Sequence, residues 1–267
     1  MQIWQASIIA ILGMSAVMAG LYAWGRQREN MATVDVGWTA GVGLVTCYFA
    51  CLSDGWLTRK ILICSMVLLW SGRLFSHILL NRVLRESEED ARYTGLRKHW
   101  GSDASRKFFW FFQAQGPLAV LFSVPPLIAM HHSNPTLTLG DVAGLTIWLV
   151  AWSGESLADH QLEHFRRNPS NEGRVCNIGL WRYSRHPNYF FEWLHWWAYV
   201  AMAIAEPYGA ATLLGPILMY LFLTRLTGIP YTEKQSLKSR GDAYRLYQQT
   251  TNRFFPWFPR KSTLPIS

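Results

Sequence analysis

The sequence is poor in charge and lacks paired cysteines. Only 16 % of its 267 residues are charged, whereas about 25 % are charged in a typical soluble protein. Its four cysteines, Cys47, Cys51, Cys64 and Cys176, form no C-x-x-C pair. Three of them lie in apolar stretches, where a reduced cysteine behaves as a small hydrophobic residue. We therefore expect neither a disulfide framework nor a zinc site.

A glycine-rich G-x-G-x-x-G motif is also absent, which argues against a Rossmann dinucleotide-binding domain. Half of the residues are hydrophobic, and they occur in blocks of about twenty, the length that a helix needs to cross a bilayer. The mean hydropathy of +0.06 averages these blocks with polar, basic connections. Disordered and collagen-like classes are excluded, and an ordinary soluble domain is disfavoured.

The apolar blocks predict an all-α, polytopic membrane helix bundle of about seven transmembrane helices. The second block contains Asp35 and three glycines, which leaves open whether its helix is continuous. The first lacks the basic start of a signal peptide, and we expect it to be retained. The expected spans are 3–24, 34–52, 61–80, 108–131, 139–158, 189–205 and 208–229.

Basic residues are nearly missing from every second connection. Of the 25 lysines and arginines, 21 fall in the segments 25–33, 81–107, 160–187 and after 230. This asymmetry predicts an external N-terminus and a cytoplasmic C-terminus, in an integral membrane protein of the bacterial inner membrane. The net charge of +8 thus follows membrane topology and gives no indication of nucleic-acid binding. We also expect no obligate protein partner.

One cytoplasmic segment is much richer in polar side chains than topology requires. Between residues 155 and 192 it contains acidic, histidine, asparagine and tyrosine side chains among its arginines. Glu155 and Asp159 are four residues apart and share a helix face. Arg174 offers a planar donor suited to phosphate. Glu192 lies about one turn inside the sixth span, where a carboxylate is costly and indicates a functional role or an interfacial pairing with arginine.

The stretch G-L-W-R-Y-S-R-H-P-N-Y-F-F-E, residues 179–192, closely resembles the signature of the membrane-embedded steroid 5α-reductase and sterol reductase superfamily. The likeness covers about the last 120 residues and is greatest to its bacterial branch, which has no assigned substrate. It implies a bundle whose C-terminal half wraps NADPH. On this basis the chain is a single transmembrane domain, 1–267, with a substrate-cavity half, 1–107, and a cofactor-binding half, 108–267.

The resemblance also assigns roles to individual residues. Arg174 would hold the phosphates, and Asp159 with Glu155 would hold polar atoms of the dinucleotide. Glu192 would bind the nicotinamide carboxamide and so take part in catalysis. The remaining cofactor-binding residues implied by the signature are Tyr183, Arg185, His186, Asn188 and Tyr189.

Upstream, R-L-F-S-H-I-L-L-N-R resembles the reductase segment in which Asn81 and Arg82 would reach the adenosine half, and Arg225 matches a family arginine. Asp35 is the only acid in the second span, and it is the candidate for polarising a substrate carbonyl or supplying a proton. The position is equally compatible with a helix N-terminal acid. The sequence departs from the steroid reductases here and at Trp70, where they have tyrosine. The acidic run 86–93 is read as a solvated loop paired with arginines, with Tyr93 or Arg92 stacking on adenine as the alternative.

The favoured function is NADPH-dependent reduction of an enone-type C=C bond in a steroid-like or other lipid. The alternative is an S-adenosylmethionine-dependent membrane methyltransferase resembling isoprenylcysteine carboxyl methyltransferase, which shares R-H-P-x-Y. That family usually has glycine where this chain has Phe191, and Glu192 follows as in the reductases. A third reading is a lipid-binding scaffold without catalysis. The lipid, the choice of NADPH over NADH, and the proton donor stay open.

Overall fold

The computed structural model describes residues 2–85, 89–131 and 135–261. Every regular element in these ranges is helical, which confirms the all-α prediction. Two short segments, η1 (Leu79–Leu84) and η6 (Phe222–Leu226), are π-helical continuations of longer helices. The main helices are α1 (Ile3–Gln27), α2 (Thr33–Leu52), α3 (Leu57–Ile78), α4 (Ala91–Trp100), α5 (Ala104–Phe122), α6 (Val124–Met130), α7 (Leu139–Arg167), α8 (Pro187–Ala203), α9 (Leu214–Leu221) and α10 (Ile229–Thr250).

Five helical segments are long and apolar enough to cross a membrane, among the described residues. They overlap five of the seven expected spans, and they indicate an integral membrane protein. The other two expected spans form α7 and α8. At 17 residues, α8 is shorter than the roughly 20 that a hydrocarbon core requires. The five segments are Ile3–Gln27, Thr33–Leu52, Leu57–Leu84, Ala91–Met130 and Gly209–Thr250.

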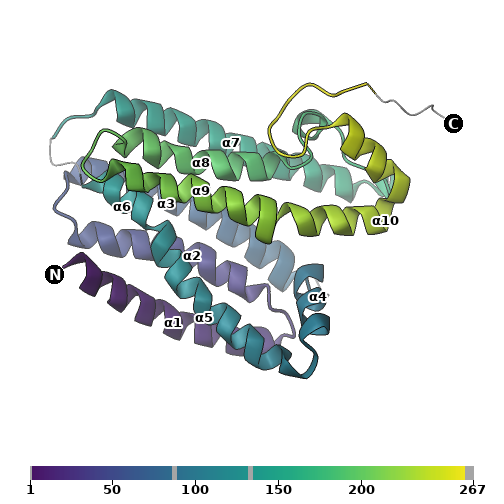
Figure 1. Cartoon of the computed structure of the whole chain (residues 1–267), viewed down its shortest axis with the longest axis horizontal. Helices are drawn as coiled ribbons and strands as arrows, with labels where there is room; N and C mark the ends of the chain where they lie inside the picture. The colour runs from purple at the N-terminus through teal and green to yellow at the C-terminus, as the bar shows by residue number, and fades with distance from the viewer. Residues whose placement is uncertain (1, 86–88, 132–134, 262–267) are drawn as a thin grey trace. The chain divides into compact units, whose positions relative to one another are not determined.

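The chain divides into two compact units. The first comprises Met1–Leu137 with Ala203–Thr212, and the second comprises Thr138–Met202 with Leu213–Ser267. In the first unit, α2 packs against α1, α3 and α5 (Figure 1). Arg59, fully buried at the start of α3, lies 3.9 Å from the Glu206 carboxylate. This ion pair ties the 203–212 segment to the first unit.

Helix α2 is continuous, which answers the question that its glycines raised. A methyl group at Gly41 would collide with Met14 of α1, and one at Gly37 would collide with Met18. Small residues allow membrane helices to approach closely. The glycines therefore bring α1 and α2 together, and they do not break the helix.

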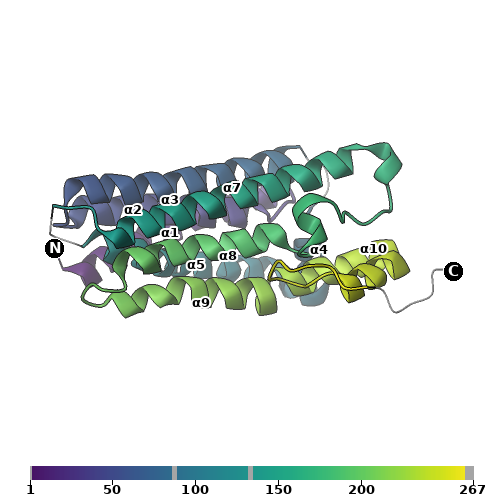
Figure 2. The same ribbon diagram turned by 90° about the horizontal axis from the view of Figure 1, so that it is seen from above.

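In the second unit, α7 and α8 lie side by side in both views (Figure 1, Figure 2). Added methyl groups at Gly144 and Gly154 of α7 would meet Ala198 and Phe191 of α8, respectively. The later residue of α7 thus faces the earlier residue of α8. The two helices are therefore antiparallel. The last turns of α7 and the first turn of α8 consequently lie at the same end of the pair.

Candidate functional site

Four of the predicted site residues lie along one edge of the α7–α8 pair. The Asn188 amide on α8 donates a hydrogen bond to the Asp159 carboxylate on α7, at 3.1 Å. One turn further from the helix ends lie Glu155 and Glu192, which are only 4 % and 6 % exposed. We call these four residues the α7–α8 edge. It combines buried carboxylates with an amide on two facing helices.

A histidine and a tyrosine continue the α8 side of this edge. Nε2 of His195 and the hydroxyl of Tyr199 lie 2.9 Å apart, and both side chains are buried. Counted from Asn188, Glu192, His195 and Tyr199 follow at intervals of four, three and four residues, the spacing of one helix face. Sequence analysis did not single out this pair, although the spacing was available as a signal.

The structure divides the R-Y-S-R-H-P-N-Y stretch into two parts. The first part holds the C-terminal segment, because the Arg185 amide donates to Asn252, the Ser184 hydroxyl donates to Phe254, and the Tyr183 carbonyl accepts from Trp257. Tyr183 is itself partly exposed. The second part begins α8, and there the rings of His186 and Tyr189 stack at 5.5 Å.

Arg185 and His186 belong to a buried network with α10. The Arg185 guanidinium lies 2.7 Å from the Glu233 carboxylate and donates to the carbonyl oxygens of Gln248 and Thr251. His186 Nε2 lies 3.4 Å from the same carboxylate. Burial lowers the pKa of His186 below its usual 6.5, against the opposing influence of Glu233. These contacts fix the start of α8, while direct contact of either residue with a cofactor stays a prediction.

Two arginines meet at the surface of the second unit. Nε of Arg240 donates to the carbonyl oxygen of Arg174, at 2.8 Å. The Arg174 side chain is exposed and that of Arg240 is half-buried, and Gly173 beside Arg174 adopts a positive φ of 73° that glycine tolerates. Sequence analysis counted Arg240 only toward topology, since its neighbour lies 66 positions away. A guanidinium group suits phosphate.

In the first unit, Asp35 lies in a cluster of charges that satisfy one another. Its carboxylate accepts hydrogen bonds from the Tyr93 hydroxyl and from Arg92, both at 2.8 Å. Arg82 lies 3.9 Å from Asp35 and 3.7 Å from Asp90. Burial alone would raise the pKa of Asp90, but Arg92 and Arg82 hold it below its usual range. We call these five residues the Asp35 cluster.

The acidic run 86–93 contributes to this cluster through its last residues, while 86–88 lie outside the described residues. Arg92 pairs with Asp90 and Asp35, and Tyr93 is buried. These contacts agree with the paired-loop reading for Arg92. The adenine-stacking alternative stays a prediction.

The other predicted cofactor residues lie in the two π-helical segments. Asn81 and Arg82 are in η1, where the Asn81 amide contacts His77 at 3.2 Å and accepts from Arg85. Arg225 is in η6 and is exposed. π-helical turns frequently occur at functional sites, so their placement here is compatible with the predicted roles.

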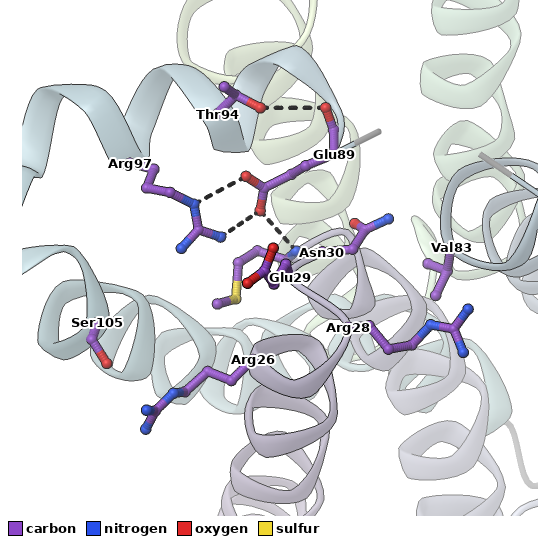
Figure 3. A pocket seen from close by; sticks show the side chains of 10 residues that line it. Arg26, Arg28, Glu29, Asn30, Val83, Glu89, Thr94, Arg97 and Ser105 are labelled. Carbon is purple, nitrogen blue, oxygen red and sulfur yellow. Dashed lines mark hydrogen bonds and ion pairs between the residues drawn. The ribbon is translucent and has the colours of Figure 1, made fainter. Parts of the chain in front are cut away.

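A polar cavity of about 840 Å³ opens in the first unit (Figure 3). Arg97 holds the Glu89 carboxylate through two hydrogen bonds of 3.2 and 2.8 Å on one side of it. The side chain of Arg26 extends on the side of Ser105, and Arg28 extends toward Val83 (Figure 3). None of the predicted site residues lines this cavity. Its wall consists of Arg26, Arg28, Glu29, Asn30, Met31, Val83, Glu89, Thr94, Arg97 and Ser105.

Comparison with known proteins places this helical chain in a family. Residues 21–251 match the model of a protein family of unknown function, DUF1295. The chain belongs to the DUF1295 family. A curated relative, "Uncharacterized protein C594.04c" of Schizosaccharomyces pombe, is 27 % identical over 269 residues, which cover 90 % of this chain and 76 % of the relative. No solved structure matches the chain.

The second unit of this DUF1295 protein combines hydrogen-bond donors with buried acceptors. The exposed Arg174 side chain can donate charge-assisted hydrogen bonds, and half-buried Arg240 donates to its backbone carbonyl oxygen. The buried carboxylates of Glu155 and Glu192 are acceptors, which suit amide and hydroxyl groups. Within the described ranges, no group of three or more histidine, cysteine or acidic residues is arranged to hold a metal ion.

Proposed function

We propose that this DUF1295 protein is a membrane-embedded, NADPH-dependent reductase of a C=C bond conjugated to a carbonyl group in a lipid. The observation that carries the proposal is the α7–α8 edge, in which Glu192 is buried one turn inside α8 beside the Asp159–Asn188 hydrogen bond. A carboxylate in a membrane helix is costly to bury, which by default indicates that it binds a functional partner. A carboxamide with two N–H donors is such a partner.

Each side chain then has a specific task. Arg174, with Arg240, binds phosphate, while Asp159, Glu155 and Asn188 bind polar atoms of the dinucleotide. Glu192 orients the carboxamide. We further propose that Asn81 and Arg82 contact the adenosine half. The rest of the binding surface would consist of Tyr183, Arg185, His186, Tyr189 and Arg225.

The cofactor supplies a hydride when it is bound. The chain must provide a proton for the other carbon of the double bond, and the Asp35 cluster contains a suitable donor. Tyr93 donates its hydroxyl hydrogen to the Asp35 carboxylate, which is also paired with Arg92. We therefore assign Asp35 the role of orienting Tyr93, and Tyr93 the role of giving the proton.

The distribution of arginine and lysine leads us to propose a cytoplasmic C-terminus and an external N-terminus, in a bacterial inner membrane. A reporter fused after Ser267 should be cytoplasmic, and one inserted near Asn134 should be external. Both positions lie outside the described residues. Reporters on the same side would contradict the proposed orientation.

The activity is tested with purified protein, deuterated NADPH and a long-chain α,β-unsaturated methyl ketone. We expect one deuterium on the β-carbon of the saturated ketone, with stoichiometric oxidation of NADPH. Mass spectrometry of the product measures this directly. Absence of transfer from NADPH and from NADH, together with methyl transfer from S-adenosylmethionine to a lipid acceptor, would overturn the proposal in favour of the methyltransferase.

A further inference from the structure

Two buried hydrogen-bond donors on α7 have no acceptor. Within the described part of the chain, the indole nitrogens of Trp148 and Trp152 make no hydrogen bond. Trp148 is only 3 % exposed. Buried polar groups are nearly always paired in native proteins, so an unpaired donor calls for an explanation. One explanation is an acceptor that arrives with a ligand.

The two tryptophans lie on the same face of α7 as the proposed cofactor residues. The positions 148, 152, 155 and 159 follow the spacing of one helix face. With a rise of 1.5 Å per residue, Trp152 lies about 4.5 Å further along the axis than Glu155, and Trp148 about 10 Å further. Their rings stack in near-parallel planes, 5.8 Å apart and inclined by 14°. The donors therefore follow Glu155 along the helix, away from the arginine-rich end.

In this direction the α7–α8 pair leads away from the arginine-rich end. On α8, the same progression leads from Glu192 to the His195–Tyr199 pair. Beyond the α7–α8 edge, the side chains on this face thus change. The carboxylates of the edge accept hydrogen bonds, whereas the indole, imidazole and phenol groups that follow can donate them. A negative charge that develops during reaction would be stabilised next to the second set.

We propose that the indole N–H groups of Trp148 and Trp152 bind the carbonyl oxygen of the substrate and stabilise the enolate that forms from it. This inference rests on the proposed reductase function and assigns the residues that bind the carbonyl group of its substrate. Hydride from the dihydronicotinamide forms a C–H bond at the β-carbon. The π electrons of the double bond move to make the enolate, and the oxygen gains negative charge. A proton then adds to the α-carbon, and the enolate electrons form the carbonyl double bond again.

A third tryptophan provides a matched control. Trp197 on α8 also has an indole nitrogen without an acceptor, within the same described range. Its ring packs edge-on against Trp193, at 5.6 Å, and Trp193 donates to the carbonyl oxygen of Pro216 at the start of α9. Trp197 therefore lies on the α9 side of α8, away from Glu192. Trp197→Phe removes an equivalent donor without touching the proposed site.

The test uses infrared spectroscopy on the full chain in detergent, with a long-chain α,β-unsaturated methyl ketone as the probe. Hydrogen bonds to its oxygen lower the carbonyl stretching frequency. We expect a lowered frequency with the wild type and with Trp197→Phe, and a frequency close to that in apolar solvent with the Trp148→Phe, Trp152→Phe double variant. Each single variant should lower kcat/KM at least about tenfold, because loss of one donor to an oxyanion is costly. The affinity for NADPH should not change.

The two proposals fail in different ways. If the wild type lowers the carbonyl frequency but does not oxidise NADPH, the reductase function is wrong, and carbonyl binding by the tryptophans stands. If the double variant, with unchanged NADPH affinity, lowers the frequency and reduces the ketone as the wild type does, the inference is overturned. An equal loss of activity in Trp197→Phe would also overturn it, because the effect would then follow tryptophan packing in general.

Discussion

The Asp35 cluster and the α7–α8 edge are both polar groups on membrane helices, but they satisfy their hydrogen bonds differently. In the Asp35 cluster, two carboxylates face two arginines and a tyrosine, and the closest contacts are 2.8 Å. The α7–α8 edge, by contrast, is continued along α7 by Trp148 and Trp152. Their buried indole donors have no acceptor among the described residues. The first arrangement is complete within the chain, whereas the second offers groups to a ligand. Changes in the cluster should therefore affect proton transfer and stability, and changes at the edge should affect ligand binding and turnover.

The largest expected effect is that of Glu192→Gln on turnover. Glutamine keeps the size of the side chain and one acceptor oxygen, so NADPH affinity should change by only a few-fold. A misplacement of the reacting atoms by about 1 Å can cost on the order of 100-fold in rate, and kcat should fall by about that factor. Stopped-flow kinetics with NADPH titration separate the two quantities. A variant with wild-type kcat would remove Glu192 from the mechanism.

The next effect distinguishes two members of the Asp35 cluster, Tyr93 and Asp35. Tyr93→Phe removes the proposed proton donor and leaves the Asp35–Arg92 ion pair, so kcat should fall about 100-fold, the typical contribution of a general acid. The thermal midpoint should change little. Asp35→Asn should lower the midpoint as well, because it weakens the bond from Arg92. If Tyr93→Phe retains full activity, the proton comes from another group.

Arg174→Ala should weaken NADPH binding at least tenfold, since a charge-assisted hydrogen bond contributes about 1.5–3 kcal/mol. The loss should shrink as salt is added. Arg167→Ala is the matched control, because Arg167 is an exposed arginine already paired with Glu163. Equilibrium binding at several salt concentrations measures both. Equal affinities for the two variants would assign Arg174 to membrane topology alone.

The smallest effect concerns the pH dependence of stability. The pKa of His186 is lowered by burial, so the unfolded chain binds more protons than the folded one below pH 6.5. The free energy of unfolding is therefore unaffected by this histidine above about pH 6.5. It decreases as the pH falls below that value, by at most about 1.4 kcal/mol per pH unit. His186→Gln should flatten the decrease in thermal midpoint between pH 7.5 and 5.5. His160→Gln, at an exposed position of α7, should retain the wild-type slope, and identical slopes for all three proteins would contradict the assignment.

The sequence predicted the helical bundle well, because apolar blocks and basic connections are local patterns. It also placed Asp159 and Asn188 in one cluster, and they share a hydrogen bond. It did not reveal the contacts made by Arg185, since Glu233 and Thr251 lie far along the chain. Nor did it identify Arg240 beside Arg174. Such pairings depend on how α10 and the C-terminal segment fold back, which no local pattern records.

The glycines of α2 also show that a local sequence pattern does not predict contacts between distant segments. Composition alone allows a broken helix at Gly37 and Gly41, because glycine weakens a helix. In the structure, the missing side chains make room for Met18 and Met14 of α1. Whether a glycine breaks a helix or lets another helix approach depends on a neighbour that the local sequence does not specify.

The nucleotide that accompanies the protein through purification tests the central claim most directly. Protein extracted in mild detergent and freed of loose small molecules is denatured, and its released nucleotides are identified by mass spectrometry. The account predicts NADP(H) in the wild type and its loss in Arg174→Ala. S-adenosylmethionine in place of NADP(H), bound by the wild type while added NADPH is ignored, would contradict it.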